Sequence, residues 1–416
     1  MLIQTLMIAL LSGAPPTDLT ALLDEAQRNN PEIAAALSRQ AAAEALPSQR
    51  EAPPDPIASV AYTNDTVTGL TLGSSEVSTL AFGWTQEVPY PGKLRLAGDA
   101  ARREAEVSRR RVEIIRLDLT SRIKQGYANL YRLDRTMSIL ADSRQLLLSL
   151  QDSTRARYEG GAGILHDVLK AQTEVTRLDV ELAKLAQERS SQQAELNVLA
   201  GRTPDRLLGP AVTLPSGASI DPVSLEQEAL SNSPEILELE SAVTRDDAEL
   251  QLARRQLKPD FMWGAAYQNR GGLDPMVMGM FGLRLPVYRD RKQAQGIVQA
   301  EHGIDASKQD VAAARLRIAS TVRDLSARVA RAESLEQLYT EAVIPQAQSA
   351  FESSSSAYSV GRVDFLALLN DFTTLLGYEV DLETQRAEKV SALAGLERLT
   401  ARQLLLAETT SWKVTR

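Results

Sequence analysis

The chain has 416 residues, a formal net charge of −8 at pH 7, no cysteine and two histidines. The lack of cysteine excludes disulfides, thiolate metal sites and cysteine nucleophiles, and the acidic balance disfavours a free-standing nucleic-acid binder. The sequence has no Gly-rich phosphate loop, serine nucleophile elbow or HExxH motif, so nothing in it supports an enzyme or a cofactor. No run of 18 apolar residues occurs, which excludes a membrane-spanning α-helix but not membrane-spanning strands.

The N-terminal residues 1–14 have the features of an export signal. They form a short apolar core that ends in small residues and is followed by Pro15 and Pro16. Such a segment predicts export from the cytoplasm. One expected feature is missing, because no lysine or arginine precedes the apolar run. The alternative interpretation is an apolar terminus without a targeting role.

An internal duplication organises the rest of the chain. Asn30-Pro31-Glu32-Ile33 recurs as Ser233-Pro234-Glu235-Ile236, and a longer series recurs 200 residues later. That series pairs Tyr158 with Tyr358, Gly161 with Gly361, Leu169 with Leu369 and Thr173 with Thr373. A repeat of this length indicates two copies of one structural unit. We therefore predict repeat 1 over 15–203, repeat 2 over 204–405 and a C-terminal tail over 406–416.

Long helices are predicted in each repeat, at about 92–158 and 164–201 and again at about 289–357 and 363–405, after a shorter helix at the start of the repeat. These tracts are rich in Ala, Leu, Glu, Arg and Gln, which lose little side-chain freedom in a helix. Apolar or small residues recur there every seventh position, which is typical of helices that supercoil around neighbours. The positions are Ala105, Val112, Leu119, Gly126, Leu133, Leu140 and Leu147 in the first copy, and Ile297, Ile304, Val311, Ile318, Leu325, Ala332 and Tyr339 in the second.

Four strands are predicted between the helices, at about 57–65, 77–88, 260–269 and 276–286. Each alternates with period two, and one parity is apolar and aromatic while the other is small, polar or flexible. This pattern matches strands that face lipid on one side and a lumen on the other. The alternative is a soluble sheet packed on the helices, but heptad-patterned helices offer no broad apolar face to cover it.

Four strands cannot close a barrel, and open sheet edges are not tolerated in lipid, so the chain must oligomerise. A dimer would provide eight strands, whose interior side chains fill, whereas a trimer would provide twelve and leave a lumen. We therefore expect a homotrimer embedded in outer-membrane lipid. The fold class expected is mainly α, with long antiparallel helical hairpins and a β-barrel portion.

This duplicated arrangement resembles the TolC-like outer-membrane efflux family over essentially the whole chain after residue 14. The segment YEGGAGILHDVLKAQ at 158–172, echoed by YSVGRVDFLALLND at 358–371, adds to the resemblance. The family implies a trimeric twelve-stranded barrel continued by a periplasmic helical barrel, opened by an inner-membrane pump and a periplasmic adaptor. The segment QEVPYPGKLR at 86–95 is similar to the heavy-metal (Czc/Cus-type) branch.

The Gly-bearing breaks in the long helices predict turns at their far ends, where the family places its gate and adaptor contacts. The turn residues are Gly160, Gly161, Gly163 and Gly361. Polar residues cluster beside them, and we expect a lock of charge-assisted hydrogen bonds there. The candidates are Asp167, Arg362, Asp364, Asn370 and Asp371. Family members often carry aspartates six and nine residues after the second turn glycine, where this chain has Ala367 and Asn370.

Methionine is concentrated in the second strand pair, where Met262, Met276, Met278 and Met280 all have the inward parity. Thioethers are soft ligands that suit Cu(I) and Ag(I), so a ladder of metal contacts is one interpretation. The other is an adaptable lining that packs across a narrow lumen. His302 lacks the further ligands that a metal site needs. His166 lies at the first turn, where a response to pH is one interpretation.

Together these features predict a passive outer-membrane exit channel of a tripartite efflux system, with heavy-metal cations as a candidate substrate. The main alternative is a periplasmic coiled-coil adaptor or structural protein without a pore. It would share the long heptads but would lack four lipid-facing strands.

Overall fold

The computed structural model describes residues 15–406 and divides into two compact units. The first unit contains the described residues up to Ala35, Glu113–Pro234 and those from Leu316 onward, and the second contains Ala36–Val112 and Glu235–Arg315. Each unit therefore takes parts of both predicted repeats. The predicted signal segment 1–14 and residues 407–416 of the predicted tail lie outside the described residues.

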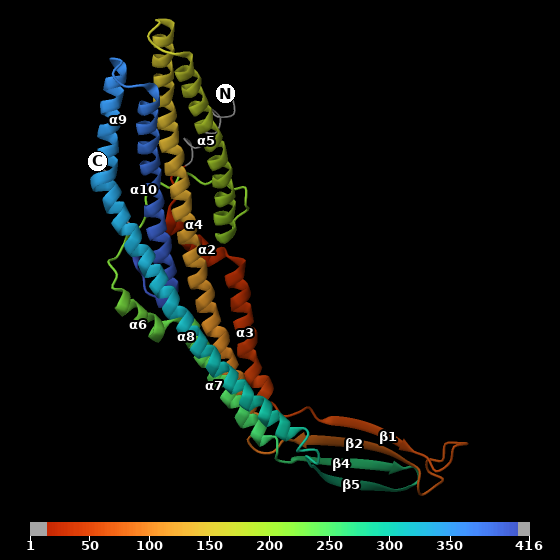
Figure 1. The fold of residues 1–416 in the computed structure, drawn as a ribbon. Helices are drawn as coiled ribbons and strands as arrows, with labels where there is room; N and C mark the ends of the chain where they lie inside the picture. Colours follow the sequence, from red (N-terminus) through yellow and green to blue (C-terminus); the bar gives the residue numbers. More distant parts are fainter. Residues whose placement is uncertain (1–14, 407–416) are drawn as a thin grey trace, which may run out of the picture. The chain divides into compact units, whose positions relative to one another are not determined.

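Helices dominate the fold, and they follow one another in the order drawn in Figure 1. The helices are α2 (Leu19–Asn29), α3 (Pro31–Glu51), α4 (Lys93–Glu159), α5 (Leu165–Leu199), α6 (Pro222–Asn232), α7 (Pro234–Arg255), α8 (Gln293–Leu338), the π-helical turn η1 (Tyr339–Val343), α9 (Ile344–Ser359) and α10 (Phe365–Thr400). The strands are β1 (Ile57–Thr63), β2 (Thr79–Val88), β3 (Ser216–Gly217), β4 (Asp260–Arg270), β5 (Leu273–Arg284) and β6 (Leu405–Leu406). No helix among the described residues combines the length and apolarity needed to cross a membrane.

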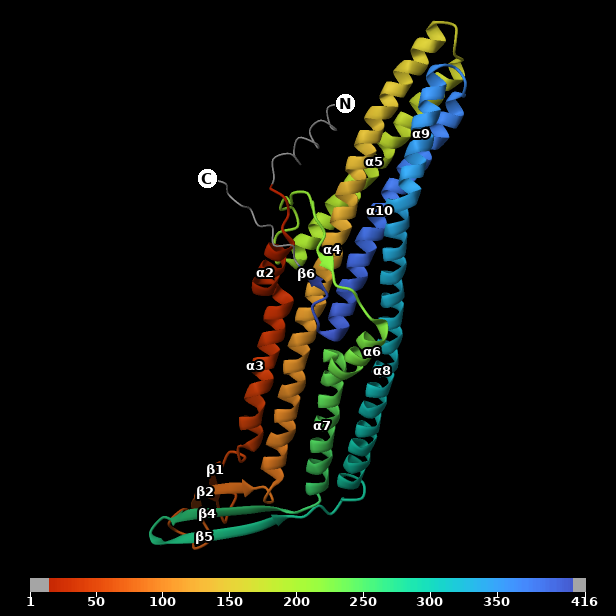
Figure 2. The same ribbon diagram turned by 90° about the vertical axis from the view of Figure 1, so that its left-hand side faces the viewer.

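In the first unit, α4, α5, α9 and α10 lie side by side (Figure 2). The seven-residue series predicted in the first copy is buried here from Leu119 to Leu147, and its first two positions, Ala105 and Val112, are buried in the second unit. Leu133, Leu140 and Leu147 of that series pack in one cluster with Phe365 and Phe372 of α10. Ion pairs join the helices outside this seam, including Arg144 to Asp179 at 2.6 Å between α4 and α5. In the first copy the heptad pattern therefore marks the contact between neighbouring helices, as expected for supercoiled packing. In the second copy Ile304, Ile318 and Ala332 are buried, and the other four positions of the series are half-buried.

Two long helices of the second repeat differ from the prediction. The helix expected over about 289–357 begins at Gln293 and is interrupted by the π-helical turn η1, just before Pro345. Proline lacks the N–H that a regular helix needs, and a π-helical turn absorbs the break in the ladder. The helix expected to reach about 405 ends at Thr400, because Ala401 adopts a left-handed conformation with φ 53° and the chain turns back to form β6.

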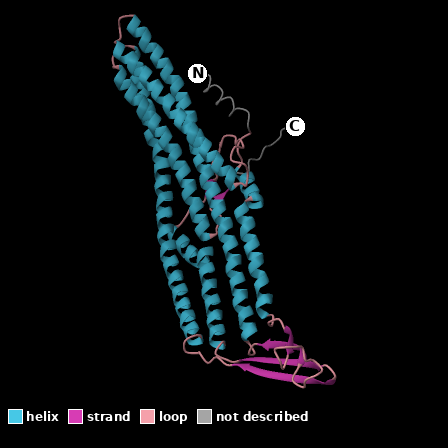
Figure 3. Ribbon diagram, turned by 90° about the vertical axis from the view of Figure 1, so that its right-hand side faces the viewer, coloured by secondary structure: helices cyan, strands magenta, loops and turns pink. Residues whose placement is uncertain are grey.

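In the second unit, four strands form one antiparallel sheet in the order β1-β2-β4-β5, and the chain enters and leaves it through the ends of helices (Figure 3). The pairing of β2 with β4 joins the two sequence repeats, with Phe82 opposite Tyr267 and Trp84 opposite Ala265. The strand predicted from residue 276 begins earlier, at Leu273, because Gly271 takes a positive φ of 72° and permits a tight turn after β4. β1 and β5 form the two edges of the sheet.

Close packing between β4 and β2 leads to a stability prediction. A Cβ atom at Gly264 would lie 2.7 Å from the backbone oxygen of Trp84, a distance that requires backbone movement. We expect Gly264→Ala to lower the stability of the sheet by about 1–3 kcal/mol, as overpacking does. Gly279→Ala is the matched control, because nothing lies within 4 Å of a Cβ placed there. Thermal unfolding of the two purified variants measures the difference, and equal melting temperatures would contradict the prediction.

Candidate functional site

Two features of the structure are candidates for function: the pair of helix turns at one end of the first unit, and the two faces of the sheet in the second unit. The turns have the same backbone geometry. Gly161 has φ +73° and Gly361 has φ +74°, and in each turn a backbone N–H reaches back to the preceding helix, from Ala162 to Arg157 at 2.8 Å and from Arg362 to Ala357 at 2.9 Å. Glycine at this left-handed position ends a helix without strain.

The first turn carries two further predicted glycines. A Cβ atom on Gly163 would lie 3.0 Å from the backbone nitrogen of Tyr158, so the chain folds closely over the end of α4 there. Gly160 has an ordinary backbone conformation and donates its N–H to the oxygen of Ala156. Within this turn, the backbone therefore requires glycine at positions 161 and 163 but not at position 160.

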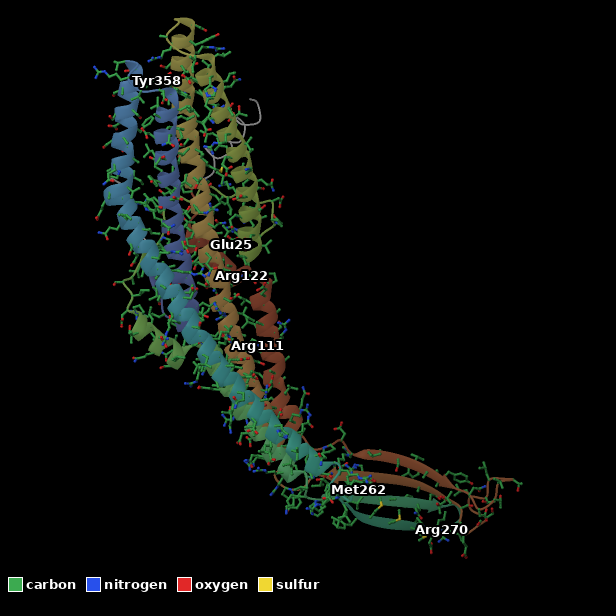
Figure 4. The ribbon with its side chains drawn as sticks, in the orientation of Figure 1. Glu25, Arg111, Arg122, Met262, Arg270 and Tyr358 are labelled. Carbon is green, nitrogen blue, oxygen red and sulfur yellow. The ribbon has the colours of Figure 1, made fainter. Side chains whose placement is uncertain are left out.

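Arg157 connects the two turns. Its guanidinium donates to the backbone oxygens of Tyr358 and Ser359, and it lies 4.7 Å from the centroid of the Tyr358 ring. The Tyr358 hydroxyl in turn donates to Thr154 on α4 at 3.2 Å. Tyr358, labelled in Figure 4, is buried against Phe365. The end of α4 is therefore bound to the end of α9 by the guanidinium of Arg157 and the hydroxyl group of Tyr358.

Arg157 and Thr154 were not among the residues predicted from the sequence, although the duplication gives a signal for Arg157. In the 200-residue alignment of the two copies, Arg157 corresponds to Ala357 and Thr154 to Ser354. A charged residue whose counterpart is alanine breaks the symmetry of the duplication. Such a position is a candidate for a contact between the two repeats of one chain.

The predicted polar residues at the turns do not form a lock within one chain. Asp364 is the N-cap of α10 and accepts the N–H of Ala367 at 2.9 Å, which explains its position by helix capping. Arg362 and Asn370 are exposed, and Asp371 is half-buried. Among the described residues, no ion pair joins Asp167, Arg362 and Asp371. A lock that includes them remains a prediction for contacts between chains.

Asp167 lies in the first turn of α5 and is half-buried. Burial raises the pKa of its carboxyl, and the charge of Asp364 raises it further, while His166 and Arg157 act in the opposite direction. Its environment therefore combines residues from both turns, even though no direct hydrogen bond joins them.

The sheet has two different faces, because side chains alternate along each strand and the register brings equal parities together. One face is apolar and exposed, with Val277 at 81% and Phe281 at 70% of full exposure. Trp84 and Trp263 meet on it edge to face with ring centroids 4.6 Å apart. An exposed apolar patch of this kind marks contact with a membrane or a partner.

The opposite face carries the four predicted methionines together with small and polar residues. Met262 lies opposite Gly282, Met280 opposite Gly264, Met278 opposite Ala266 and Met276 opposite Gln268. Met276, Met278 and Met280 are 51%, 45% and 44% exposed. The register therefore brings all four thioethers to one side of the β4–β5 hairpin, where Figure 4 labels Met262.

The junction between sheet and helices, within the predicted segment 86–95, is held by contacts across the two repeats. Lys93 at the start of α4 pairs with Asp260 of β4 at 2.7 Å, and the same carboxylate accepts the N–H of Tyr90 at 2.8 Å. Arg255 donates to the backbone oxygen of Pro91 and stacks over Tyr90. These bonds fix the direction in which the strands leave the helices.

Other charged groups have structural partners. Arg109 and Arg110 pair with Glu106, and Arg111 pairs with Glu238. Within residues 15–406, no group of three or more His, Asp or Glu side chains is placed to hold a metal ion.

Comparison with known proteins gives consistent results. The family model described as outer membrane efflux protein matches residues 22–202 and 225–402, one segment in each predicted repeat. The cobalt-zinc-cadmium resistance protein CzcC of Cupriavidus metallidurans is 21% identical over 313 residues, which cover 75% of this chain and 74% of CzcC.

Solved structures show the same fold. The outer membrane protein VceC of Vibrio cholerae superposes with a TM-score of 0.76 at 20% identity, over 92% of this chain and 96% of VceC. The open state of the MtrE channel of Neisseria gonorrhoeae gives 0.73 at 17% identity, over 93% and 89% of the two chains. CusC gives 0.74 at 15% identity, over 92% of each chain. The predicted fold of one chain, mainly α with long antiparallel helical hairpins and four strands, is therefore confirmed.

Proposed function

The chain belongs to the outer membrane efflux protein family, which makes it an outer-membrane efflux channel, and we propose that three copies of it together form the conduit. One observation carries the trimer: a four-stranded sheet with two open edges, β1 and β5, and an exposed apolar face. In lipid every backbone N–H and C=O must be paired, so both edges need a strand from another copy. Head-to-tail pairing of β1 with β5 satisfies both edges, and three copies close a barrel of twelve strands.

The two faces of the sheet support this orientation. The face with Phe82, Trp263 and Phe281 would contact lipid, and the face with the methionines would line the conduit. Twelve strands leave an open lumen, whereas the eight strands of a dimer would be filled by side chains. The alternative of a periplasmic adaptor without a pore leaves the exposed aromatic face unexplained.

The channel is passive in this proposal. The energy for transport comes from an inner-membrane pump, which is connected to the channel through a periplasmic adaptor. The helices of the first unit extend into the periplasm, and the turns at Gly161 and Gly361 form the end that meets the adaptor. The Arg157 contact between the turns supports a gate there, because it ties two helix ends that must separate for the end to open. The name of CzcC supports heavy-metal cations as the substrate class.

Cysteine cross-linking tests the trimer, and the lack of native cysteine makes the result easy to interpret. We expect Val60→Cys on β1, combined with cysteine at 277, 279 or 281 on β5, to give oxidised species of two and three chains in outer membranes. The three positions lie on the face of the sheet that also carries Val60, and they sample three neighbouring registers between chains. Val60→Cys with Tyr267→Cys is the control, because β4 is already paired on both sides. A ladder beyond three chains, or species of at most two, would contradict the trimer.

A further inference from the structure

We propose that Met262, Met276, Met278 and Met280 form a track of weak binding sites for soft monovalent cations, of the class of Ag(I) and Cu(I), on the β4–β5 hairpin. The proposal rests on the proposed function, in which this face of the sheet lines the conduit. It narrows the substrate class, because the name of CzcC concerns cobalt, zinc and cadmium, whereas thioethers prefer soft monovalent ions.

The placement of the methionines is selective. Four of the seven methionines in the chain lie in one hairpin, and the register puts all four on the same face. If methionine served here as an apolar residue in contact with lipid, it would occur on the other face, where Val277, Phe281 and Leu283 lie. Met137, in contrast, packs against the buried cluster of the first unit, which is the usual structural role of methionine.

Glycines opposite two of the methionines shape the site. Met262 faces Gly282, and its terminal methyl carbon lies 3.1 Å from where a Cβ on that glycine would be. Met280 faces Gly264 in the same way, with its methyl carbon 3.5 Å from the corresponding point. Each thioether therefore lies across the partner strand, in space that any other residue would occupy.

Met262 and Met280 are diagonal neighbours across the hairpin. Diagonal Cβ atoms in antiparallel strands are about 7–8 Å apart, which long side chains can bridge. Met278 and Met276 continue the row along β5 at intervals of about 7 Å, two residues of a strand. Because three of these side chains are about half exposed, a small cation can reach the sulfur atoms from the solvent side.

The charge on this face also favours a soft monovalent ion. Glu87 is the carboxylate closest in register to Met262, and it is paired with Arg284 of β5. The remaining cross-strand partners of the methionines are glycine, alanine and glutamine. A neutral site of thioethers gives little attraction to hard divalent ions, and it holds soft ions weakly enough for them to move on, as conduction requires.

The test is a titration of the purified trimer in detergent with Ag(I), followed by the ¹³C NMR signals of the methionine methyl groups. We expect the signals of Met262, Met276, Met278 and Met280, assigned by single Met→Leu substitutions, to shift in fast exchange, while that of Met137 stays unchanged. Zn(II) should shift none of them. Unshifted signals for the four hairpin methionines, or equal shifts with Zn(II), would overturn the proposal.

A face-exchange variant provides the matched control. Met276→Leu, Met278→Leu and Met280→Leu remove three thioethers, and Val277→Met, Phe281→Met and Leu283→Met restore three on the opposite face. We expect the Ag(I) shifts to be lost from β5, and block of single-channel conductance by Ag(I) to be lost with them. Should the exchange variant assemble poorly, the single variant Met278→Leu must still weaken the block. If the protein conducts and cross-links as a trimer but its methionine signals do not shift with Ag(I), the methionine track alone is overturned. If no trimer forms, the proposed function is refuted.

Discussion

Replacing Arg157 with alanine is expected to increase the open probability of the channel in planar bilayers about tenfold. The substitution removes the hydrogen bonds from Arg157 to the backbone oxygens of Tyr358 and Ser359, and its contact with the Tyr358 ring. A charge-assisted hydrogen bond contributes about 1.5 kcal/mol or more, and a change of that size shifts an equilibrium about tenfold. Arg157→Lys keeps the charge but loses the planar group that stacks on the ring. Its open probability should therefore lie between those of the wild type and of Arg157→Ala.

Arg362→Ala is the comparison that separates two forms of the gate. Arg362 is exposed and has no ion pair among the described residues, so this substitution should change the open probability little if the contact within one chain holds the turns together. If Arg362→Ala opens the channel more than Arg157→Ala does, the lock lies between chains, with Asp167 and Asp371 as the partners first expected. Single-channel recording of both variants at the same voltage gives the answer.

The second large effect is expected at Glu397, which is buried in the first unit. Its carboxylate pairs with Lys124 at 2.5 Å and also accepts the N–H groups of Leu404 and Leu405 at 2.7 and 2.8 Å. Glu397→Ala leaves a buried ammonium and two buried N–H groups without partners. We expect a loss of about 3–5 kcal/mol in the free energy of unfolding, the usual cost of breaking a buried pair from one side.

Two further variants separate the charge from the hydrogen bonds. Glu397→Gln keeps an acceptor for the two N–H groups, so it should be less destabilising than Glu397→Ala. Lys124→Met combined with Glu397→Gln removes both charges at similar volume and should recover most of the stability. Thermal unfolding followed by far-ultraviolet circular dichroism measures all three. If Glu397→Ala unfolds at the wild-type temperature, the return of the chain after α10 is held by other contacts.

Several features of this protein could be predicted from the sequence by itself because they depend on local periodicity. Side chains recur every seven residues along a supercoiled helix and every two along a strand, so the buried series from Ala105 to Leu147 and the parity of the methionines follow from neighbouring residues alone. The turns at Gly161 and Gly361 could also be predicted from local sequence, because a left-handed residue that ends a helix is usually glycine. The duplication then supported the predicted turns, because each repeat has one.

The tertiary structure decided which elements meet. The pairing of β2 with β4, the reach of Arg157 to Tyr358 and the burial of Glu397 with Lys124 all join residues more than 150 positions apart. Asn197, the counterpart of Glu397 in the first copy, bonds the backbone oxygens of Pro204 and Arg206 where the chain leaves α5, whereas Glu397 bonds N–H groups and a lysine. Both copies need a polar side chain at that position, but its chemistry depends on which groups the fold brings to it. Periodicity carries no information about such partners, because they are chosen by packing between segments distant in the chain.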